Sequence, residues 1–286
     1  MIKFRAAMVS VLVSLFVLTG CGGGEEVAQN SEGAATANAP VKNVTLKMAS
    51  AFPSSLPILG DGGVDWAETV GVLSGGSLKV KFFEPNALVP ALEAIPAASK
   101  GSVEMAWATS GYYAGINNVF SMFTTLPFGP NATEFLAWYY YGDGQTLADE
   151  LYLEHDIKYL PCIMIPPEAS GWFKEEVKTL DDLKGMKIRV QNSRMAIAMV
   201  EALGGSPTPI AWGELYSALA QGVVDGAENN PPSFESNRHY EECRYFTPDA
   251  HTRVPDLLMI STPVWESLSA QEREWLQEAA DESSSY

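Results

Sequence analysis

The chain has 286 residues, and its 35 Asp and Glu side chains outnumber its 18 Lys and Arg side chains, giving a formal net charge of −17 at pH 7. No block of Lys or Arg occurs in the sequence, so we expect no nucleic-acid partner. The acidic surface gives no long-range attraction for an anion either, so an anionic ligand has to be held by a few local groups.

Residues 1–21 predict a lipoprotein signal peptide. Two basic residues, Lys3 and Arg5, precede an apolar run over residues 6–18, which is too short to cross a hydrocarbon core of ~30 Å comfortably as a helix. The run ends in the lipobox sequence LTGC at residues 18–21. We therefore expect lipidation of Cys21, a location in the periplasm or at the cell surface, and membrane contact through the lipid anchor alone.

Residues 22–43 contain no aromatic residue and little apolar bulk. Such a segment cannot bury enough surface to offset its ordering entropy, which predicts a flexible linker. The globular part begins near Val44, and the roughly 240 residues that follow are enough for two lobes of ordinary domain size.

Strand-like and helix-like stretches alternate from the start of the globular part. Strands are predicted at residues 44–50, 78–83 and 103–108, with helices at 61–73 and 87–100 between them. This βαβαβ rhythm predicts a parallel sheet flanked by helices. Two further helices, rich in aromatic side chains, are predicted at residues 131–141 and 144–154.

A long apolar strand at residues 157–165 is predicted to cross from one lobe to the other. A second α/β set follows, with helices at 180–184, 193–203 and 214–221 and strands at 187–190 and 207–210. We therefore expect residues 44–160 to form mainly lobe I and residues 161–250 mainly lobe II. Residues 251–286 are expected to form a return segment and C-terminal helices.

One pattern occurs in both halves of the chain. The sequence AASK precedes Gly101 and SVEMA follows it, whereas ALAQ precedes Gly222 and VVDGA follows it. Each is a predicted helix with a glycine cap, followed by a strand start that carries an acid three residues after the glycine. The pattern favours two similar α/β lobes that face each other across a cleft.

Ligands of open α/β sheets bind outside the carboxyl ends of the strands, so candidate binding residues are those at or after strand ends. Arg189 is next to last in its predicted strand, and its planar N–H donors match a carboxylate. Asn229 offers an amide that both donates and accepts, and Glu228 and Glu168 are carboxylates that suit a cation. The alternatives are an edge-strand arginine in water, a polar turn and a solvated loop glutamate.

Aromatic side chains also gather after the predicted strand ends, where they suit a pocket that excludes water from a small ligand. They are Phe52, Tyr112, Tyr113, Trp172 and Trp212, and core packing is the alternative for each. No Gly-x-Ser-x-Gly elbow, P-loop or Gly-x-Gly-x-x-Gly motif occurs, and no histidine lies beside a candidate nucleophile. We therefore expect a binding protein that requires no cofactor, and not an enzyme.

From Val44 onward the chain resembles the solute-binding proteins of TRAP transporters, the DctP-type family. The most specific segments are LKGMKIRV at 183–190, WGELYSALAQG at 212–222 and VVDGAENN at 223–230. The resemblance implies a two-lobed, periplasmic-binding-protein-like (type II) α/β fold with crossing strands and a connecting helix, which closes on its ligand by hinge motion. It also implies delivery of the ligand to TRAP membrane subunits. Arg189 stands where the family's arginine grips the ligand carboxylate.

Within the family, the first half most resembles the branch that binds 2-oxo acids, through SGYY at 110–113 and GWF at 171–173. A glutamine and a glutamate of that branch hold a metal ion, and Glu168 and Glu228 stand at their places here. Because Glu168 adds a negative charge, the resemblance implies a ligand-bridging Na⁺ or Ca²⁺ beside a 2-oxo or 2-hydroxy monocarboxylate. Asn229 replaces a tryptophan of the branch, which implies a more polar wall.

Two alternatives stay open at this point. The second half also resembles binders of C4-dicarboxylates and uronates, and the amides of Asn229 and Asn230 suit sugar hydroxyls. A lipid-anchored enzyme on a similar fold is the alternative from another class. The chain ends inside a helical pattern, where the family usually continues for some tens of residues, so we expect a truncated C-terminus.

Overall fold

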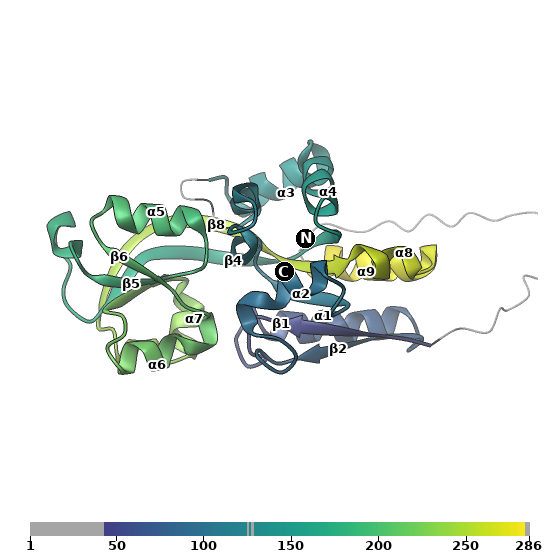
Figure 1. Cartoon of the computed structure of the whole chain (residues 1–286), viewed down its shortest axis with the longest axis horizontal. Coiled ribbons are helices and arrows are strands. Elements are labelled where there is room, and N and C mark those ends of the chain that lie inside the picture. Colours follow the sequence, from purple (N-terminus) through teal and green to yellow (C-terminus); the bar gives the residue numbers. More distant parts are fainter. Residues whose placement is uncertain (1–42, 125, 127–128, 284–286) are drawn as a thin grey trace, which may run out of the picture. The chain divides into compact units, whose positions relative to one another are not determined.

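Two long antiparallel strands run through both halves of the folded region. The computed structural model describes residues 43–124, 126 and 129–283. The strands β4 (Ile157–Phe173) and β8 (Tyr245–Ser261) pair along their lengths, and Figure 1 shows them side by side. The predicted signal peptide, Cys21 and the predicted linker up to residue 42 lie outside the described residues. No helix in the described ranges is both long and apolar enough to cross a membrane.

Six shorter strands complete the sheet: β1 (Val44–Ser50), β2 (Leu78–Phe83), β3 (Met105–Ala108), β5 (Lys187–Val190), β6 (Ser206–Pro209) and β7 (Gly226–Asn229). The strand order is β2-β1-β3-β8-β4-β7-β5-β6. Within each outer half the three short strands are parallel, as predicted, and β8 and β4 join them antiparallel. The order 2-1-3-8 is therefore repeated as 6-5-7-4, and the predicted two-lobed α/β fold with crossing strands is confirmed.

We call the half built on β1, β2 and β3 lobe I, and the half built on β5, β6 and β7 lobe II. β3 pairs with the end of β8 in lobe I, and β7 pairs with the end of β4 in lobe II. Both long strands therefore belong to both lobes. The predicted lobe boundaries after residues 160 and 250 fall inside β4 and β8.

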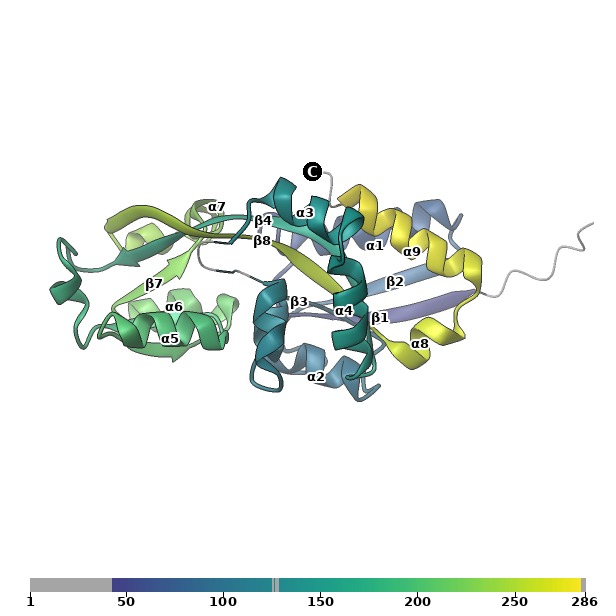
Figure 2. The ribbon, with the colours of Figure 1, turned by 90° about the horizontal axis from the view of Figure 1, so that it is seen from above.

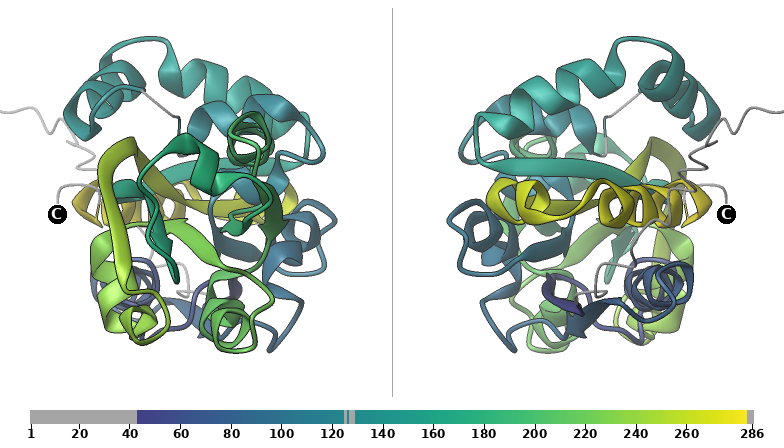
Figure 3. Two further views of the ribbon diagram at one scale, coloured as in Figure 1. Left: turned by 90° about the vertical axis from the view of Figure 1, so that its left-hand side faces the viewer. Right: turned by 90° about the vertical axis from the view of Figure 1, so that its right-hand side faces the viewer.

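Helices cover the strands of both lobes: α1 (Asp61–Leu73), α2 (Ala94–Ser99), α3 (Ala132–Tyr141), α4 (Gly144–Leu153), α5 (Arg194–Ala202), α6 (Leu215–Ala220), α7 (Pro231–Ser236), α8 (Thr262–Ser267) and α9 (Ala270–Ser283). In lobe II, Val200 of α5 packs with Ile188 in one apolar cluster, whereas Leu219 of α6 belongs with Ala227 to the main core. These helices thus lie on opposite faces of the lobe, and Figure 3 shows helices on both sides of the strands. The last helix, α9, lies beside α1 and β4 (Figure 2).

The helix-to-strand joints at Gly101 and Gly222 have the same geometry. Both glycines are left-handed, with φ of +70° and +71°, a conformation that glycine adopts without steric cost. The Gly101 N–H donates to the Ala98 carbonyl at 2.9 Å, and the Gly222 N–H donates to the Leu219 carbonyl at 3.0 Å. In both joints the next N–H reaches back five residues, at 2.8 and 2.9 Å. The sequence pattern shared by the two halves therefore marks one structural unit that is used twice.

Two segments differ from the predicted structure, and both bear on the site. β4 continues past residue 165 to Phe173 because β8 and then β7 supply it with main-chain partners, so Glu168 lies in a strand and not in a loop. Its pairing register shifts between Ile165 and Gly171, and such bulges redirect side chains. The segment after Asn229, for which no helix was predicted, is a helix start: Pro231 opens α7, and the Asn230 side chain caps it.

Candidate binding site between the lobes

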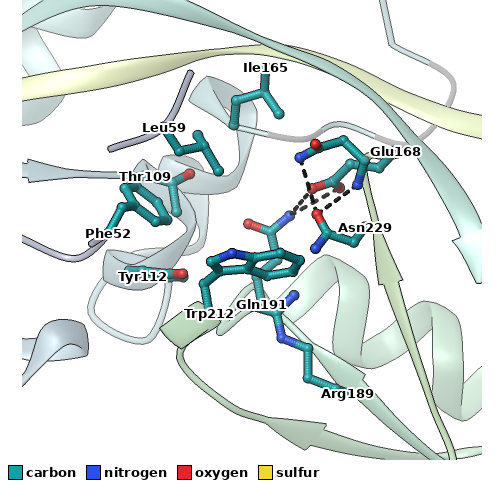
Figure 4. A pocket seen from close by; sticks show the side chains of 11 residues that line it. Phe52, Leu59, Thr109, Tyr112, Ile165, Glu168, Arg189, Gln191, Trp212 and Asn229 are labelled. Carbon is teal, nitrogen blue, oxygen red and sulfur yellow. Dashed lines mark hydrogen bonds between the residues drawn. The ribbon is translucent and has the colours of Figure 1, made fainter. Parts of the chain in front are cut away.

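A small cavity, of about 20 Å³, lies where residues at and after strand ends of the two lobes meet. This is room for little more than one water molecule. Lobe I contributes residues that follow β1 and β3, and lobe II contributes residues at and after the ends of β5 and β7 (Figure 4). The lining consists of Phe52, Leu59, Thr109, Tyr112, Ile165, Glu168, Arg189, Gln191, Trp212, Asn229 and Asn230.

The Arg189 guanidinium is held at the wall of this cavity by lobe II. Its side chain is buried, its Nε–H donates to the Ile210 carbonyl at 3.0 Å, and Nη1 donates to the Glu228 main-chain carbonyl at 3.5 Å. Its Cζ lies 5.3 Å from the centre of the Trp212 ring, which suits a cation–π contact. These contacts use only part of its five N–H donors and leave Nη2 available to a ligand.

The positive charge of Arg189 has no anionic partner within the part of the chain that the structure describes. None of the ion pairs formed among the described residues includes it. A buried charge is costly unless it is paired, so an anion in the cavity would stabilise this arrangement. Burial, and then the neighbouring Arg189 charge, lower the pKa of His239 to about 4, so that imidazole is neutral at neutral pH.

Two buried glutamates are joined through Gln191. The Gln191 side chain donates from Nε2 to both carboxylate oxygens of Glu168, at 3.2 and 3.4 Å (Figure 4). Its main-chain N–H donates to Oε1 of Glu228 at 3.2 Å. Glu168 is 6% exposed and Glu228 is 2% exposed, so both carboxylates lie in a region of low dielectric constant. Only Glu168 lines the cavity, since Glu228 faces a separate apolar cavity in lobe II.

These carboxylates fit a cation site that is completed by other oxygen ligands. The described residues contain no cluster of three or more His, Cys, Asp or Glu side chains that could hold a metal ion. Hard cations such as Na⁺ and Ca²⁺ accept carboxylate, amide and main-chain oxygens. Glu168 and Glu228 could therefore supply part of the coordination, and a bound acid would have to add oxygens of its own.

Two further hydrogen-bond donors near the cavity have no acceptor in the described chain. The Asn229 Oδ1 accepts from the main-chain N–H and the side-chain amide of Asn230, at 2.6 and 3.1 Å. Its Nδ2 is left without a partner, as is the buried Nε1 of Trp212. Buried donors without acceptors cost free energy, so a ligand with oxygen acceptors would satisfy them.

Six of the predicted binding and metal residues come together at the cavity: Phe52, Tyr112, Glu168, Arg189, Trp212 and Asn229. Tyr113 is not among the lining residues, because its ring packs on Phe120 and His155 and its hydroxyl donates to Ser99 Oγ. Side-chain packing thus places neighbouring tyrosines differently, with Tyr112 at the cavity and Tyr113 in the core of lobe I.

Trp172 also packs away from the cavity lining. Its ring stacks on Phe234 and Phe246, with ring centres 3.9 and 4.2 Å apart, and its Nε1 donates to the Asn229 carbonyl at 3.3 Å. It therefore supports the strand that carries Asn229 without lining the cavity itself.

Four lining residues were not predicted: Leu59, Thr109, Ile165 and Gln191, while Asn230 was named only for the alternative of a sugar ligand. Thr109 and Gln191 directly follow β3 and β5, so the strand-end rule could have found them. Leu59 had no such signal, because it lies in the long loop after β1. It is fixed there by a contact distant in sequence, in which Trp107 Nε1 donates to the Leu59 carbonyl at 2.7 Å.

A two-lobed α/β fold with a buried guanidinium at a cavity between the lobes, paired with no carboxylate among the described residues, is typical of solute-binding proteins. Residues 48–286 match the DctP family, described as bacterial extracellular solute-binding protein, family 7, and the chain belongs to this family. It is 43% identical over 106 residues to a solute-binding protein of Chromohalobacter salexigens, a match covering 37% of this chain and 32% of that protein. It is 32% identical over 190 residues to a monocarboxylate 2-oxoacid-binding periplasmic protein of Nostoc sp.. That match covers 66% of this chain and 51% of the relative, so the chain spans at most about half the length of these two curated relatives.

Solved structures of TRAP transporter solute-binding proteins share this fold. One from Bordetella bronchiseptica, with calcium and picolinate, has a TM-score of 0.80 and 28% identity, covering 85% of this chain and 73% of that one. One from Pseudoalteromonas atlantica, with sodium and pyruvate, has a TM-score of 0.80 and 29% identity over 85% and 74% of the two chains. One from Xanthobacter autotrophicus, with β-D-galacturonate, has a TM-score of 0.75 and 25% identity over 84% and 80%. The family expected from the sequence motifs is confirmed.

Proposed function

We propose that the protein is a lipid-anchored solute-binding protein of a TRAP transporter, which captures a small organic acid outside the cytoplasmic membrane and delivers it to the TRAP membrane subunits. The observation that carries this proposal is the buried Arg189 guanidinium, which faces a cavity between two lobes and has no anionic partner among the described residues. A ligand carboxylate would supply that partner through paired, charge-assisted hydrogen bonds.

We infer that the ligand is a 2-oxo or 2-hydroxy monocarboxylate. Arg189 is the one cationic side chain among the described residues that line the cavity, which favours one carboxylate over two. The unpartnered donors on Asn229 and Trp212 suit an oxygen next to the carboxylate. The volume of about 20 Å³ is too small for any acid, so the lobes have to move apart for either ligand, and an acid of a few carbons needs less added space than a uronate. The pyruvate in the Pseudoalteromonas structure supports the same ligand class.

We also propose that Na⁺ or Ca²⁺ accompanies the acid, with Glu168 and Glu228 as its protein ligands. Glu168 lines the cavity, and Gln191 joins it to the second buried carboxylate, Glu228. Carboxylate oxygens of this kind, together with oxygens of the bound acid, are ligands that Na⁺ and Ca²⁺ accept. The calcium and sodium ions in the Bordetella and Pseudoalteromonas structures support this part of the proposal.

The test is calorimetric titration of the purified protein with pyruvate, lactate and galacturonate, in the presence and absence of calcium. We expect Arg189→Ala to lose at least about 100-fold in affinity for the preferred acid, because a charge-assisted pair of hydrogen bonds disappears. Arg244→Ala removes an exposed arginine of lobe II and should leave the affinity unchanged. Equal affinity of wild type and Arg189→Ala would overturn the role of Arg189.

The lipid anchor is a separate part of the proposal, because Cys21 lies outside the described residues. It is supported by the LTGC sequence at residues 18–21 and the apolar run before it. We expect the wild-type protein to fractionate with membranes and Cys21→Ser to fractionate with soluble proteins. A Cys21→Ser variant that stays in the membrane fraction would contradict lipid anchoring.

A further inference from the structure

Gln191 occupies a central place in the site that the proposed function does not yet use. It directly follows β5, which carries Arg189, and it is 5% exposed. Its main chain and its side chain bond to different carboxylates, Glu228 and Glu168. In Figure 4 its amide lies beside the Glu168 carboxylate at the cavity. One residue therefore links both carboxylates to the strand that carries the guanidinium.

The two links differ in what they can do. The main-chain N–H of Gln191 holds Glu228 whatever side chain is present at position 191, because every residue except proline carries this donor. The Nε2 amide holds Glu168 through both carboxylate oxygens, which fixes the plane of that carboxylate. Glu168 lies in the bulged part of β4, where pairing with β8 is irregular, so the strand alone orients its side chain less firmly.

We propose that Gln191 is a positioning residue that orients Glu168 for cation binding while taking no part in gripping the acid. This inference rests on the proposed function, in which Glu168 is a cation ligand. Side chains that hold a metal ligand by hydrogen bonding commonly change metal affinity by about 10- to 100-fold when they are removed. The carbonyls of Ile210 and Glu228 and the Trp212 ring hold the Arg189 side chain in place. Binding of the acid by Arg189 therefore does not depend on the Gln191 side chain.

The two affinities should consequently respond differently to substitution. Without the amide, Glu168 loses a hydrogen-bond donor that orients its carboxylate and binds a cation less well, but an acid that enters a cation-loaded site still meets Arg189. Gln191→Met keeps the length and burial of the side chain and removes its donor. Gln221→Met is the matched control, because Gln221 is an exposed glutamine at the end of α6 in the same lobe.

The experiment titrates the full chain with calcium chloride, at a fixed and saturating concentration of pyruvate, and then with pyruvate at saturating calcium. We expect Gln191→Met to weaken calcium binding by about 10- to 100-fold and to change pyruvate affinity at saturating calcium less than about threefold. Gln221→Met should match the wild type in both titrations. Thermal unfolding without ligand checks that the variants are folded, and Gln191→Asn, which keeps a shorter amide, replaces Gln191→Met if the latter does not fold.

The outcomes separate this inference from the proposed function. Calcium binding that is unchanged in Gln191→Met, or pyruvate binding that falls as much as calcium binding, would overturn the positioning role. A wild type that binds pyruvate through Arg189 but does not bind calcium would also overturn it, while the acid-binding function stands. A wild type that binds neither calcium nor any acid would remove both.

Discussion

The two lobes share one topology but present opposite chemistry to the cleft. The strand orders 2-1-3-8 and 6-5-7-4 correspond, and so do the residues that follow equivalent strands. Phe52 follows β1 where Gln191 follows β5, and Thr109 and Tyr112 follow β3 where Asn230 follows β7. Lobe I therefore supplies mainly aromatic and apolar surface, whereas lobe II supplies the guanidinium and the amides.

This difference implies that the two lobes have different roles in ligand binding although they share one topology. Polar groups that recognise an acid have to be held rigidly, and lobe II holds Arg189 through the Ile210 and Glu228 carbonyls inside or next to its own sheet. Apolar groups exclude water and strengthen the electrostatic interactions of the ligand without specifying it. We thus expect recognition to depend on lobe II, and retention of the ligand to depend on lobe I.

The largest effect beyond the site residues is expected in the loop that forms the wall of lobe I. A Cβ at Gly60 would lie 1.8 Å from the carbonyl oxygen of Pro53, so Gly60→Ala has to displace main chain in the loop that carries Phe52 and Leu59. We expect it to lower the free energy of unfolding by about 3 kcal/mol in urea titrations.

The matched control for this loop is Gly71→Ala in α1, where an added Cβ meets no atom within 4 Å. There the change should stabilise the protein by about 0.5–1 kcal/mol, because alanine loses less conformational freedom in a helix. Equal stabilities of Gly60→Ala and the wild type would show that the wall of lobe I is not held by this tight turn.

A smaller effect on the free energy of unfolding is expected when the pH is lowered, and it arises in lobe II. Buried His239 packs edge-on against Trp212 in lobe II, and burial together with Arg189 lowers its pKa from 6.5 to about 4. Between pH 6.5 and 4, His239 is protonated in the unfolded chain but neutral in the folded chain. The free energy of unfolding therefore decreases as the pH falls through this window.

We expect the wild type to lose on the order of 2 kcal/mol more than His239→Phe between pH 7 and pH 4, measured by urea unfolding at both pH values. Carboxylates elsewhere contribute equally to both proteins, so the difference isolates the histidine. Parallel pH profiles of the two proteins would contradict a neutral, buried His239.

The smallest effect is expected from reducing the apolar surface that lobe I presents to the cavity. Phe52 is 3% exposed, and its ring centre lies 6.1 Å from that of Tyr112. Phe52→Leu removes part of this apolar surface and should weaken acid binding by about 1 kcal/mol, mainly through faster dissociation. Stopped-flow measurements of the dissociation rate would check this. If Phe52→Leu lost selectivity among acids and did not release them faster, lobe I would also take part in recognition.

Local patterns were sufficient to predict most of the fold. The strands at 44–50, 78–83 and 187–190 and the helix at 61–73 have the predicted bounds, because alternation, helical periodicity and glycine caps act within a few residues. The continuation of β4 to Phe173 was missed, since two prolines in the sequence argue against a strand and only pairing with β8 and β7 extends it. β8 was likewise described only as a return segment.

The site was predictable where strand ends determine it. Arg189 and Asn229 lie at the ends of β5 and β7 and were predicted as candidates from that position, with support from the family motif for Arg189 alone. The separation of Tyr112 from Tyr113, and the packing of Trp172 on Phe234 and Phe246, depend on contacts between distant residues, so neighbouring aromatics could not be distinguished. Gln191 was passed over because a glutamine after a strand is ordinary until its two carboxylate partners are known.

The most direct test of acid binding by Arg189 is a crystal structure of the full chain purified with whatever ligand it retains. We expect electron density for a small acid between the lobes, with its carboxylate within hydrogen-bond distance of the Arg189 guanidinium and its second oxygen toward lobe II. Density for a ligand whose charged group lies against Phe52 and Tyr112, with Arg189 bonded only to protein, would contradict it.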